Sequence, residues 1–368
     1  MKKITGILIL SAIMLAGCRN NNSGNTSETI FPEENKRNST LDYVQEYEAL
    51  SSLLQQFEEP AQVFRVASTE HSQVIGRQGT VINLNPDYLE TVDGESVTGE
   101  ITVVLKEQTN QRELVLGNTQ TVSNGRLIVS GGAYYIGMAA DGKELRIKKG
   151  KSLDMEFPKV TEDEMELFYG QRDSLGQMNW QVAQQKFVKK KYKEEDFIAE
   201  TDVFMVVFET IEGIDTIKSF SQKEFEKQQK RRKMEKETRE VEEKLYESIK
   251  INQLGWINCD RFYQIPPDCK TDLIIAMDNQ SIDVPAAKAF LVFKKINSVL
   301  SYNYFADKDN IRFNNIPVGE DVKLIIYTAE KGNVYIHSSG FTLKKDETLT
   351  IALKKSNDKE LENMLMLH

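Results

Sequence analysis

The sequence predicts a mainly β protein with an α+β middle section, built from two antiparallel β-sandwich modules and one long charged helix. Two observations predict this fold class. Apolar residues recur at every second position in many short runs, and turn signals separate these runs about every ten residues, which is the pattern of antiparallel strands. One stretch of the middle section lacks glycine and proline and is rich in helix-forming residues, which favours a helix.

Residues 1–17 have the pattern of a lipoprotein signal peptide. Lys2 and Lys3 precede an apolar run that is too short to span a bilayer, and small residues come just before Cys18. The sequence Leu-Ala-Gly-Cys that ends at Cys18 resembles a bacterial lipobox. The resemblance implies that Cys18 is lipidated, with acyl chains such as palmitate, and becomes the first residue of the mature protein. An ordinary signal peptide that ends in cysteine, or an uncleaved anchor, is the alternative.

Two segments connect this N-terminus to the predicted β modules. Residues 18–40 are polar and almost free of aliphatic side chains, so we expect a flexible tether there. Residues 41–60 carry apolar side chains at helical intervals up to Pro60, which predicts an amphipathic helix.

The residues after Cys18 bear on localisation. A lipidated cysteine implies a stable lipid anchor, because two or more acyl chains give stable membrane binding. We expect this anchor to lie in the outer membrane. Surface-exposed lipoproteins of Bacteroidetes-type bacteria usually carry acidic residues directly after this cysteine, whereas this chain has Arg-Asn-Asn-Asn. The departure favours a periplasm-facing protein, with the cell surface as the alternative.

Residues 61–160 are predicted to form the first β-sandwich. Their alternating runs, such as "EITVVLKE" and "RLIVSGGAYYIGMAA", have the period of strands with one buried face. Asx-Gly pairs, which favour tight hairpin turns, separate the runs at three places: Asp93-Gly94, Asn124-Gly125 and Asp141-Gly142.

The layout of this segment, with "VTGEITVVLKE" followed by "NGRLIVSGGAYYIGMAADGKEL", resembles β-sandwich domains of uncharacterised Bacteroidetes envelope lipoproteins. The ZU5-type sandwich is similar to these domains. The phrases "ELFYGQRDSLGQMNW" and "LGWINCDRF" also resemble recurrent sequences of such lipoproteins. The resemblance implies an architecture and a location in the cell envelope, and no activity.

The α+β middle section covers residues 161–255. Within it, residues 221–250 contain neither glycine nor proline, and Ser221 with Glu224 has the spacing of a capping box, so we predict a long charged helix. The basic residues 230–233 alternate with glutamates at helical spacing, which indicates a solvated face with salt bridges. Docking of an envelope protein on this helix is the alternative interpretation.

Residues 256–355 are predicted to form the second β-sandwich, of immunoglobulin-like or transthyretin-like type, because six or seven alternating runs fit into this length. The phrase "FNNIPVGEDVKLIIY" resembles the turn and strand of regulatory-domain-like sandwiches in bacterial envelope proteins, which implies a module that binds or spaces. Residues 356–368 follow as a C-terminal tail.

Cys259 and Cys269 are predicted to form a disulfide. Disulfides persist beyond the inner membrane, and Pro266-Pro267 between the cysteines favours a small closed loop. Closing such a loop contributes about 2.5–3 kcal/mol, less any strain. Two reduced, buried cysteines and a reactive pair are the alternatives. A zinc site is disfavoured because it takes about four ligands.

No catalytic residue, metal ligand or cofactor site is predicted. The sequence has no GxSxG, HExxH, P-loop, GxGxxG or EF-hand spacing. Its three histidines are His71, His337 and His368, and His337 is interpreted as a structural histidine on a strand face. Glycoside hydrolysis needs a pair of carboxylates, but 56 acidic residues supply pairs without specificity.

Two residues are candidate modification sites. Ser174 and Thr216 each follow an aspartate and precede an aliphatic residue, and this pattern resembles the O-glycosylation acceptors of exported Bacteroidetes proteins.

Together these patterns predict a non-catalytic binding or scaffolding lipoprotein of the bacterial cell envelope. Its predicted partners are the membrane, through lipid on Cys18, and an envelope protein, through the 221–250 helix. The formal net charge of −9 argues against nucleic acid. The alternatives are an accessory component of an outer-membrane secretion or gliding apparatus and a hydrolase that acts on glycan or peptide.

Overall fold

The computed structural model describes residues 39–189, 210–211, 214–215, 244–278, 284–305 and 310–367. Several predictions fall outside these residues: the signal peptide, lipidation of Cys18, residues 18–38 of the tether, Thr216 and residues 221–243 of the predicted helix. The last two residues of the predicted tether, 39 and 40, are helical. The prediction of a mainly β fold is confirmed, because most described residues lie in antiparallel sheets. The described part contains three short α-helices, α1 (Ser39–Gln55), α2 (Gln111–Leu116) and α5 (Asp358–Met364).

The first pair of sheets holds the strands of the N-terminal part. One sheet has nine strands, with the central order β1 (Gln62–Ala67), β5 (Glu100–Gln108), β7 (Arg126–Ala140), β15 (Gly255–Phe262), β10 (Glu166–Arg172) and β11 (Met178–Lys186). Its short outer strands are β4 (Leu89–Thr91), β6 (Val122–Ser123) and β8 (Lys143–Ile147). The other sheet has the order β14 (Ile249–Ile251), β9 (Leu153–Glu156), β3 (Val81–Leu84) and β2 (Ser72–Ile75).

Side-chain alternation gives these two sheets a shared core. In β5, the side chains of Ile101, Val103 and Leu105 are fully buried while those between them are only partly buried. They pack in one cluster with buried side chains of the four-stranded sheet, such as Ile82 and Met155. The period-two pattern of the sequence therefore corresponds to a sheet with one face on this core.

Two of the three predicted Asx-Gly turns join consecutive paired strands. Asn124 and Gly125 have φ values of 48° and 76°, and Asp141 and Gly142 have φ values of 49° and 76°. Two successive positive φ values define the type I′ turn, whose twist matches the flanking strands. The first pair connects β6 to β7 and the second connects β7 to β8.

Strand β15 shows that the nine-stranded sheet crosses the boundaries that we predicted at 160/161 and 255/256. It lies between β7 and β10 and is antiparallel to both, with Ile257 opposite Tyr134 and Tyr169. Sheet partners are chosen by burial of both faces and by hydrogen bonding. For that reason a segment distant in sequence completes the centre of this sheet.

The prediction of a helix is wrong for its last residues, 244–250. Residues 244–250 are not helical: Leu245 and Tyr246 form β-bridges, and β14 pairs with β9. Ile249 and Ile251 are buried whereas Lys250 is exposed. The apolar residues of this segment thus alternate with period two. Their side chains pack in the core of the first sheet pair, and β14 forms an edge strand of the four-stranded sheet.

The second pair of sheets holds the C-terminal strands. One sheet has the order β18 (Val299–Phe305), β17 (Ala286–Phe293), β20 (Asp321–Glu330), β21 (Asn333–Thr342) and β23 (Lys354–Ser356). The other has the order β19 (Ile311–Pro317), β16 (Lys270–Met277) and β22 (Glu347–Ile351), in which β16 and β22 are parallel. The short elements η1 (Pro86–Tyr88), η2 (Pro267–Cys269), β12 (Thr210–Ile211) and β13 (Ile214–Asp215) complete the described part.

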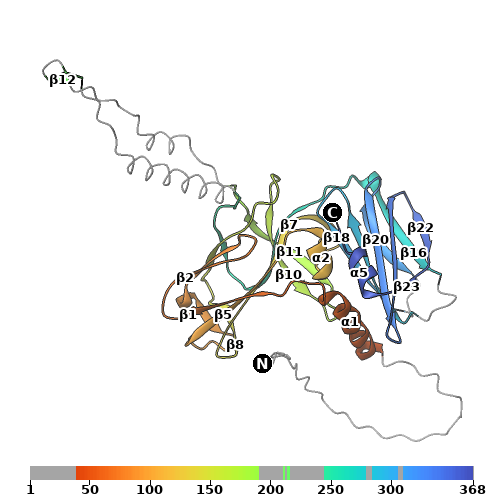
Figure 1. Ribbon diagram of the computed structural model, residues 1–368, viewed down its shortest axis with the longest axis horizontal. Coiled ribbons are helices and arrows are strands. Elements are labelled where there is room, and N and C mark those ends of the chain that lie inside the picture. Colours follow the sequence, from red (N-terminus) through yellow and green to blue (C-terminus); the bar gives the residue numbers. More distant parts are fainter. Residues whose placement is uncertain are drawn as a thin grey trace, which may run out of the picture. The chain divides into compact units, whose positions relative to one another are not determined.

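A third core joins the two sheet pairs. Every residue of β17 is buried, because one face of the strand packs within the second sheet pair and the other packs on this third core. The third core combines Leu50 of α1, Trp180 of β11, Phe290 of β17 and Tyr327 of β20. Figure 1 shows α1, α2 and α5 in the region between the strands of the two pairs.

Residues 356–368, predicted as a tail, also reach this third core. Asn357 caps α5 by accepting a hydrogen bond from the Glu360 amide at 3.0 Å. Leu361 and Met364 on this helix are buried in the third core. An apolar spacing of three residues in a short segment produces one helical face, and this face lies against the junction.

Candidate functional site

A cavity of about 260 Å³ lies at the junction of the two sheet pairs. Its walls come from α1, the residues after α2, and strands β10, β15, β17 and β20. The side chains that define it are Arg172, Lys288, Tyr47, Leu54, Trp256 and Tyr327, and we refer to it as the Arg172–Lys288 pocket. The exposed side chain of Gln55 also lines it, so the pocket reaches the surface.

The guanidinium group of Arg172 is held by main-chain carbonyls. One terminal nitrogen donates to the carbonyl oxygens of Asn118 and Gly176, at 2.7 and 2.8 Å, and the other donates to that of Gly117 at 2.8 Å. The ring of Trp256 lies against the group, with 4.8 Å between the guanidinium carbon and the ring centroid. Desolvation lowers the pKa of Arg172 from its ordinary value. The side chain is therefore fixed, and carbonyl dipoles replace a carboxylate partner.

Lys288 is a buried lysine in an apolar strand. It is 3% exposed, and its Nζ donates one hydrogen bond to Oδ1 of Asn303 at 2.6 Å. The rings of Tyr47 and Phe290 lie 5.8 and 5.4 Å from Nζ. Burial lowers the pKa of Lys288 to about 7, and the positive charge of Arg172 acts in the same direction.

The carboxylates near the pocket are already engaged. Glu58 accepts a hydrogen bond from Lys106 at 2.9 Å. Asp173 accepts the amides of Leu175 and Gln177, at 2.9 and 2.8 Å, within its own turn. Among the residues that the structure describes, no carboxylate lies within ion-pair distance of Arg172 or Lys288.

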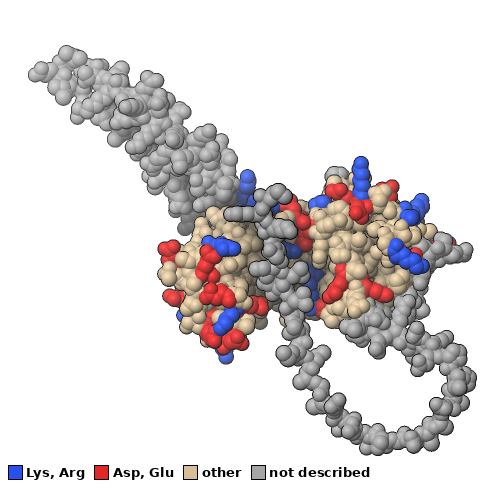
Figure 2. Space-filling model, turned by 60° about the horizontal axis from the view of Figure 1, so that its bottom comes forward, with Lys and Arg blue, Asp and Glu red and all other residues tan. Residues whose placement is uncertain are grey.

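The surface of the protein is different in this respect. Figure 2 shows acidic and basic side chains interspersed over the described residues of one face. Many of them form pairs, for example Arg146 with Glu90 at 2.9 Å. Exposed pairs of this kind contribute about 0–1 kcal/mol, whereas burying a charge without a partner costs far more. The two pocket cations are thus an energetic cost that the fold retains.

Glycine at position 176 lets the β10–β11 turn pack closely against Tyr47 in the wall of the pocket. Its φ is +68°, and a Cβ at this position would lie 1.8 Å from the hydroxyl oxygen of Tyr47. That hydroxyl accepts a hydrogen bond from Asn118 Nδ2 at 3.1 Å. The turn between β10 and β11 therefore positions both Arg172, through its carbonyl, and Tyr47.

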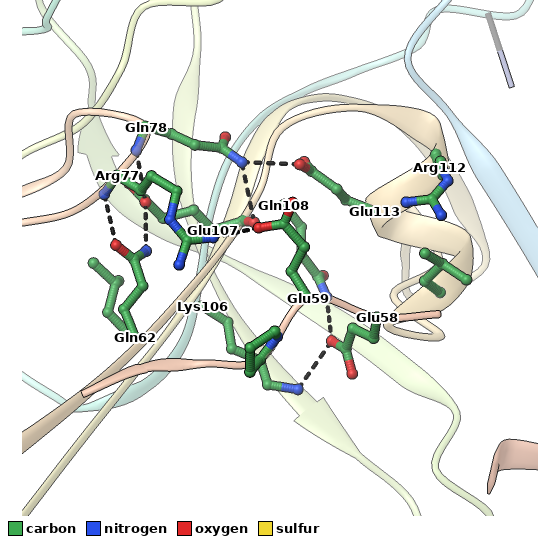
Figure 3. Close-up of a pocket in the computed structure, with 13 residues that line it drawn as sticks. Glu58, Glu59, Gln62, Arg77, Gln78, Lys106, Glu107, Gln108, Arg112 and Glu113 are labelled. Carbon is green, nitrogen blue, oxygen red and sulfur yellow. Dashed lines mark hydrogen bonds and ion pairs between the residues drawn. The ribbon is translucent and has the colours of Figure 1, made fainter. Parts of the chain in front are cut away.

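A second, smaller cavity lies beside this pocket and shares Glu58 and Lys106 with it. Figure 3 shows Glu107 among the residues that line this cavity, together with its hydrogen-bond partners Gln62 and Gln78. The carboxylate accepts from Gln62 Nε2 and the Gln78 amide, both at 2.8 Å, and from the Thr80 amide at 3.1 Å. With three neutral donors already bound, Glu107 fixes the 76–80 loop onto β5.

The predicted disulfide between Cys259 and Cys269 is not present, because both are free thiols. Cys259 lies on β15 with its side chain in the core of the first sheet pair, and burial raises its pKa. Cys269 is exposed at the end of η2, where its amide donates to the Pro266 carbonyl at 2.9 Å. β15 continues to Phe262 after Cys259, so the chain leaves the buried thiol before the proline turn begins.

The residue next to Cys259 is a buried acid, Asp260. Asp260 is fully buried, and its Oδ2 accepts from Asn258 Nδ2 at 2.6 Å. Asn258 in turn accepts from the Ser130 hydroxyl at 3.1 Å. Burial raises the pKa of Asp260 well above its ordinary value. A protonated carboxyl in a network of neutral groups is the form that this environment favours.

Other predicted residues lie away from the pocket. Ser174 is exposed in the β10–β11 turn. His337 on β21 is hydrogen-bonded on both ring nitrogens, with Nδ1 3.2 Å from the Ala352 carbonyl and Nε2 3.0 Å from the Ser339 hydroxyl. The partner of Nδ1 is thus a main-chain carbonyl where catalytic triads have a carboxylate. His71 lines an open polar surface site, and His368 lies outside the described residues.

The sequence predictions missed Arg172 and Lys288, although one signal was present. Lys288 stands between Ala287 and Ala289 in a run whose other members are apolar. A lysine in a strand buried on both faces has no solvent to reach, so it needs a specific environment. Arg172 has no comparable signal, because two of its three carbonyl partners, Gly117 and Asn118, come from a loop distant in sequence.

No family model matches this chain, and no curated protein and no solved structure is significantly similar to it. Within the described ranges, no helix is long and apolar enough to cross a membrane. The same residues contain no group of three or more histidines, cysteines and acids that could hold a metal ion. The pocket is therefore the starting point for a functional interpretation.

Proposed function

We propose that the protein is a non-catalytic binding lipoprotein of the bacterial cell envelope, anchored to the outer membrane through Cys18 and facing the periplasm. The observation that carries the binding function is the Arg172–Lys288 pocket, a cavity with two cations that lack a carboxylate partner among the described residues. In this proposal each sheet pair is a β-sandwich, and the ligand binds where the two sandwiches meet. Interfaces between modules are common positions for such sites.

Binding is favoured over catalysis by the groups that line the pocket. The Tyr47 hydroxyl accepts from Asn118, and the Tyr327 hydroxyl donates to the Leu50 carbonyl at 3.3 Å. Glu58 is paired with Lys106. General acid–base catalysis needs a group that is positioned to exchange a proton with the substrate, and these side chains are held by the protein instead. What the pocket offers is the fixed guanidinium group of Arg172 beside Lys288, whose charge depends on pH near neutrality.

The segment that follows the proposed anchor and tether in the sequence contributes to the pocket. Helix α1 follows the predicted tether in the sequence and contributes Tyr47 and Leu54 to the pocket wall. Leu50 and Leu54 are also buried in the third core. In this proposal the predicted tether therefore joins the chain at the helix that supplies part of the pocket wall.

Anchoring is tested by replacing Cys18 with serine in the full-length chain and comparing membrane and soluble fractions. Cys269→Ser is the matched control, since it removes an exposed thiol elsewhere. We expect Cys18→Ser to move the protein to the soluble fraction and to lose incorporated labelled palmitate, while Cys269→Ser behaves as the natural protein does. Retention of Cys18→Ser in the membrane fraction would contradict the lipid anchor.

Binding is tested by native mass spectrometry of the lipidated protein, extracted from its own membranes in mild detergent. We expect a small bound molecule in the natural protein and its loss in a Lys288→Met variant. Conversion of glycan or peptide substrates by the natural protein, abolished in the same variant, would instead establish the pocket as an active site and overturn the non-catalytic proposal.

A further inference from the structure

We propose that the Arg172–Lys288 pocket binds the carboxylate of a small ligand that has an apolar body, supplied either by a free organic acid or by the C-terminal residue of a peptide. This inference rests on the proposed function that the pocket is a binding site. It adds the chemical class of the ligand, and it follows from the number of free donors, the size and walls of the pocket, and its charge balance.

The free hydrogen-bond donors match a carboxylate. Besides its three carbonyl bonds, Arg172 donates to the Thr119 hydroxyl at 3.2 Å, so both terminal nitrogens are used and only Nε–H remains. Charged Lys288 has three hydrogens, of which Asn303 accepts one. Three donors then remain for a group with two oxygen atoms. A phosphate, with more oxygen atoms and more charge, would leave acceptors unsatisfied in this pocket.

The size and walls of the pocket indicate what the carboxylate is attached to. Pockets for drug-sized ligands have volumes of about 300–1,000 Å³, and this pocket, at about 260 Å³, is just below that range. Leu54, Leu116, Trp256 and Tyr327 supply apolar and aromatic surface. A ligand with one carboxylate and one small aliphatic or aromatic group would fill the cavity, as a C-terminal phenylalanine or a short aryl acid does.

The charges that face Lys288 make binding dependent on pH. Arg172 lies on β10, Asp173 lies in the turn after β10, and the paired Lys106 and Glu58 also line the pocket. The remaining titratable groups of the lining are Tyr47 and Tyr327, and burial raises the pKa of Tyr327 above its ordinary value. A bound carboxylate would favour the charged form of Lys288. Binding therefore takes up a proton at neutral pH, and affinity should fall as the pH rises above about 7.

The test is calorimetric titration of the full-length protein with four probes. Phenylacetate represents a free acid, a tripeptide ending in phenylalanine represents a peptide C-terminus, the same tripeptide with a C-terminal amide lacks the carboxylate, and inorganic phosphate represents other anions. We expect binding of phenylacetate or of the acid tripeptide and none of the amide. Tighter binding of the tripeptide than of phenylacetate identifies a peptide as the source, and the reverse identifies a free acid.

Two variants make the result specific. Lys288→Met keeps an unbranched side chain as far as Cε and removes the charged ammonium group, and Lys355→Met makes the same change at an exposed position of β23 outside the pocket lining. We expect carboxylate binding to weaken about tenfold or more in Lys288→Met, as for a lost charged hydrogen bond worth about 1.4 kcal/mol or more. Lys355→Met should bind as the natural protein does. Affinity of the natural protein should be higher at about pH 6 than at about pH 8, and that of Lys288→Met should not change.

The outcomes separate this inference from the proposed function. Equal binding of acid and amide tripeptides, or full affinity in Lys288→Met, overturns carboxylate recognition. Phosphate binding that depends on Lys288, without carboxylate binding, overturns this inference but leaves a binding pocket. Absence of binding by every probe, together with no molecule retained in the native mass spectra, overturns both.

Discussion

The strongest energetic prediction concerns the free protein: replacing Lys288 by methionine should stabilise it near neutral pH. The pKa of Lys288 is lowered from 10.5 to about 7 by burial and by Arg172. The folded state therefore binds this proton less well than the unfolded state does. One pKa unit corresponds to about 1.36 kcal/mol. The shift therefore changes the free energy of unfolding by about 5 kcal/mol between a pH below the folded-state pKa and a pH above the unfolded-state pKa.

The sign follows from the linkage between protonation and folding. Above about pH 10.5 the lysine is neutral in both states and costs nothing. Between about pH 10.5 and about pH 7 the unfolded state gains the proton first, so this group lowers stability as the pH falls. Below about pH 7 both states are protonated and the full cost remains. Stability of the ligand-free protein should thus rise with pH across this window.

Lys288→Met should abolish this contribution. Methionine has no charge to desolvate, and it loses only the hydrogen bond to Asn303, worth about 1 kcal/mol. We expect the variant to be more stable than the natural protein by about 3 kcal/mol near pH 7 and by much less near pH 10. Urea unfolding, followed by tryptophan fluorescence at a series of pH values, measures this difference, with Lys355→Met as the control. A difference that does not depend on pH would refute the reasoning.

Three further predictions concern single positions. Gly176→Ala should lower the free energy of unfolding by about 2 kcal/mol or more, because a φ of +68° disfavours alanine and the added Cβ would collide with Tyr47. The melting temperature should fall accordingly, and an unchanged melting temperature would contradict the packing of that turn. A maleimide should label Cys269 in the native protein and Cys259 only after unfolding, which peptide mass spectrometry can follow; simultaneous labelling would contradict the burial. Burial raises the pKa of Asp260 in the folded state, so the free energy of unfolding of the natural protein should fall as the pH rises above the ordinary carboxyl pKa. Asp260→Asn should not show this fall, and parallel profiles of unfolding free energy against pH for the two proteins would count against the prediction.

The parts of the fold that the sequence predicted correctly depend on local chemistry. The Asn124-Gly125 and Asp141-Gly142 turns could be predicted because few residue pairs adopt two successive positive φ values. The alternation in β5 could be predicted because it reflects one buried face. Neither inference needs knowledge of which strand lies next to which.

The parts that the sequence did not predict depend on contacts between distant segments. β15 pairs with β7 and β10 through hydrogen bonds that any strand can make, so its position in the sheet has no local signal. The spacing of Cys259 and Cys269 suggested a closed loop, but spacing does not reveal that a strand carries the chain away from the first cysteine. For the same reason the pocket was not predicted, since Arg172 and Lys288 belong to different sheet pairs.

The position of β15 also has a consequence for how the polypeptide is made. Strands β7 and β10 are synthesised well before their common neighbour, so each exposes an unpaired edge until residue 262 has emerged. Unpaired edges are templates for association with other chains. We therefore expect the growing polypeptide to need protection by a chaperone during this interval, and a chain truncated before β15 to aggregate instead of folding into a smaller domain.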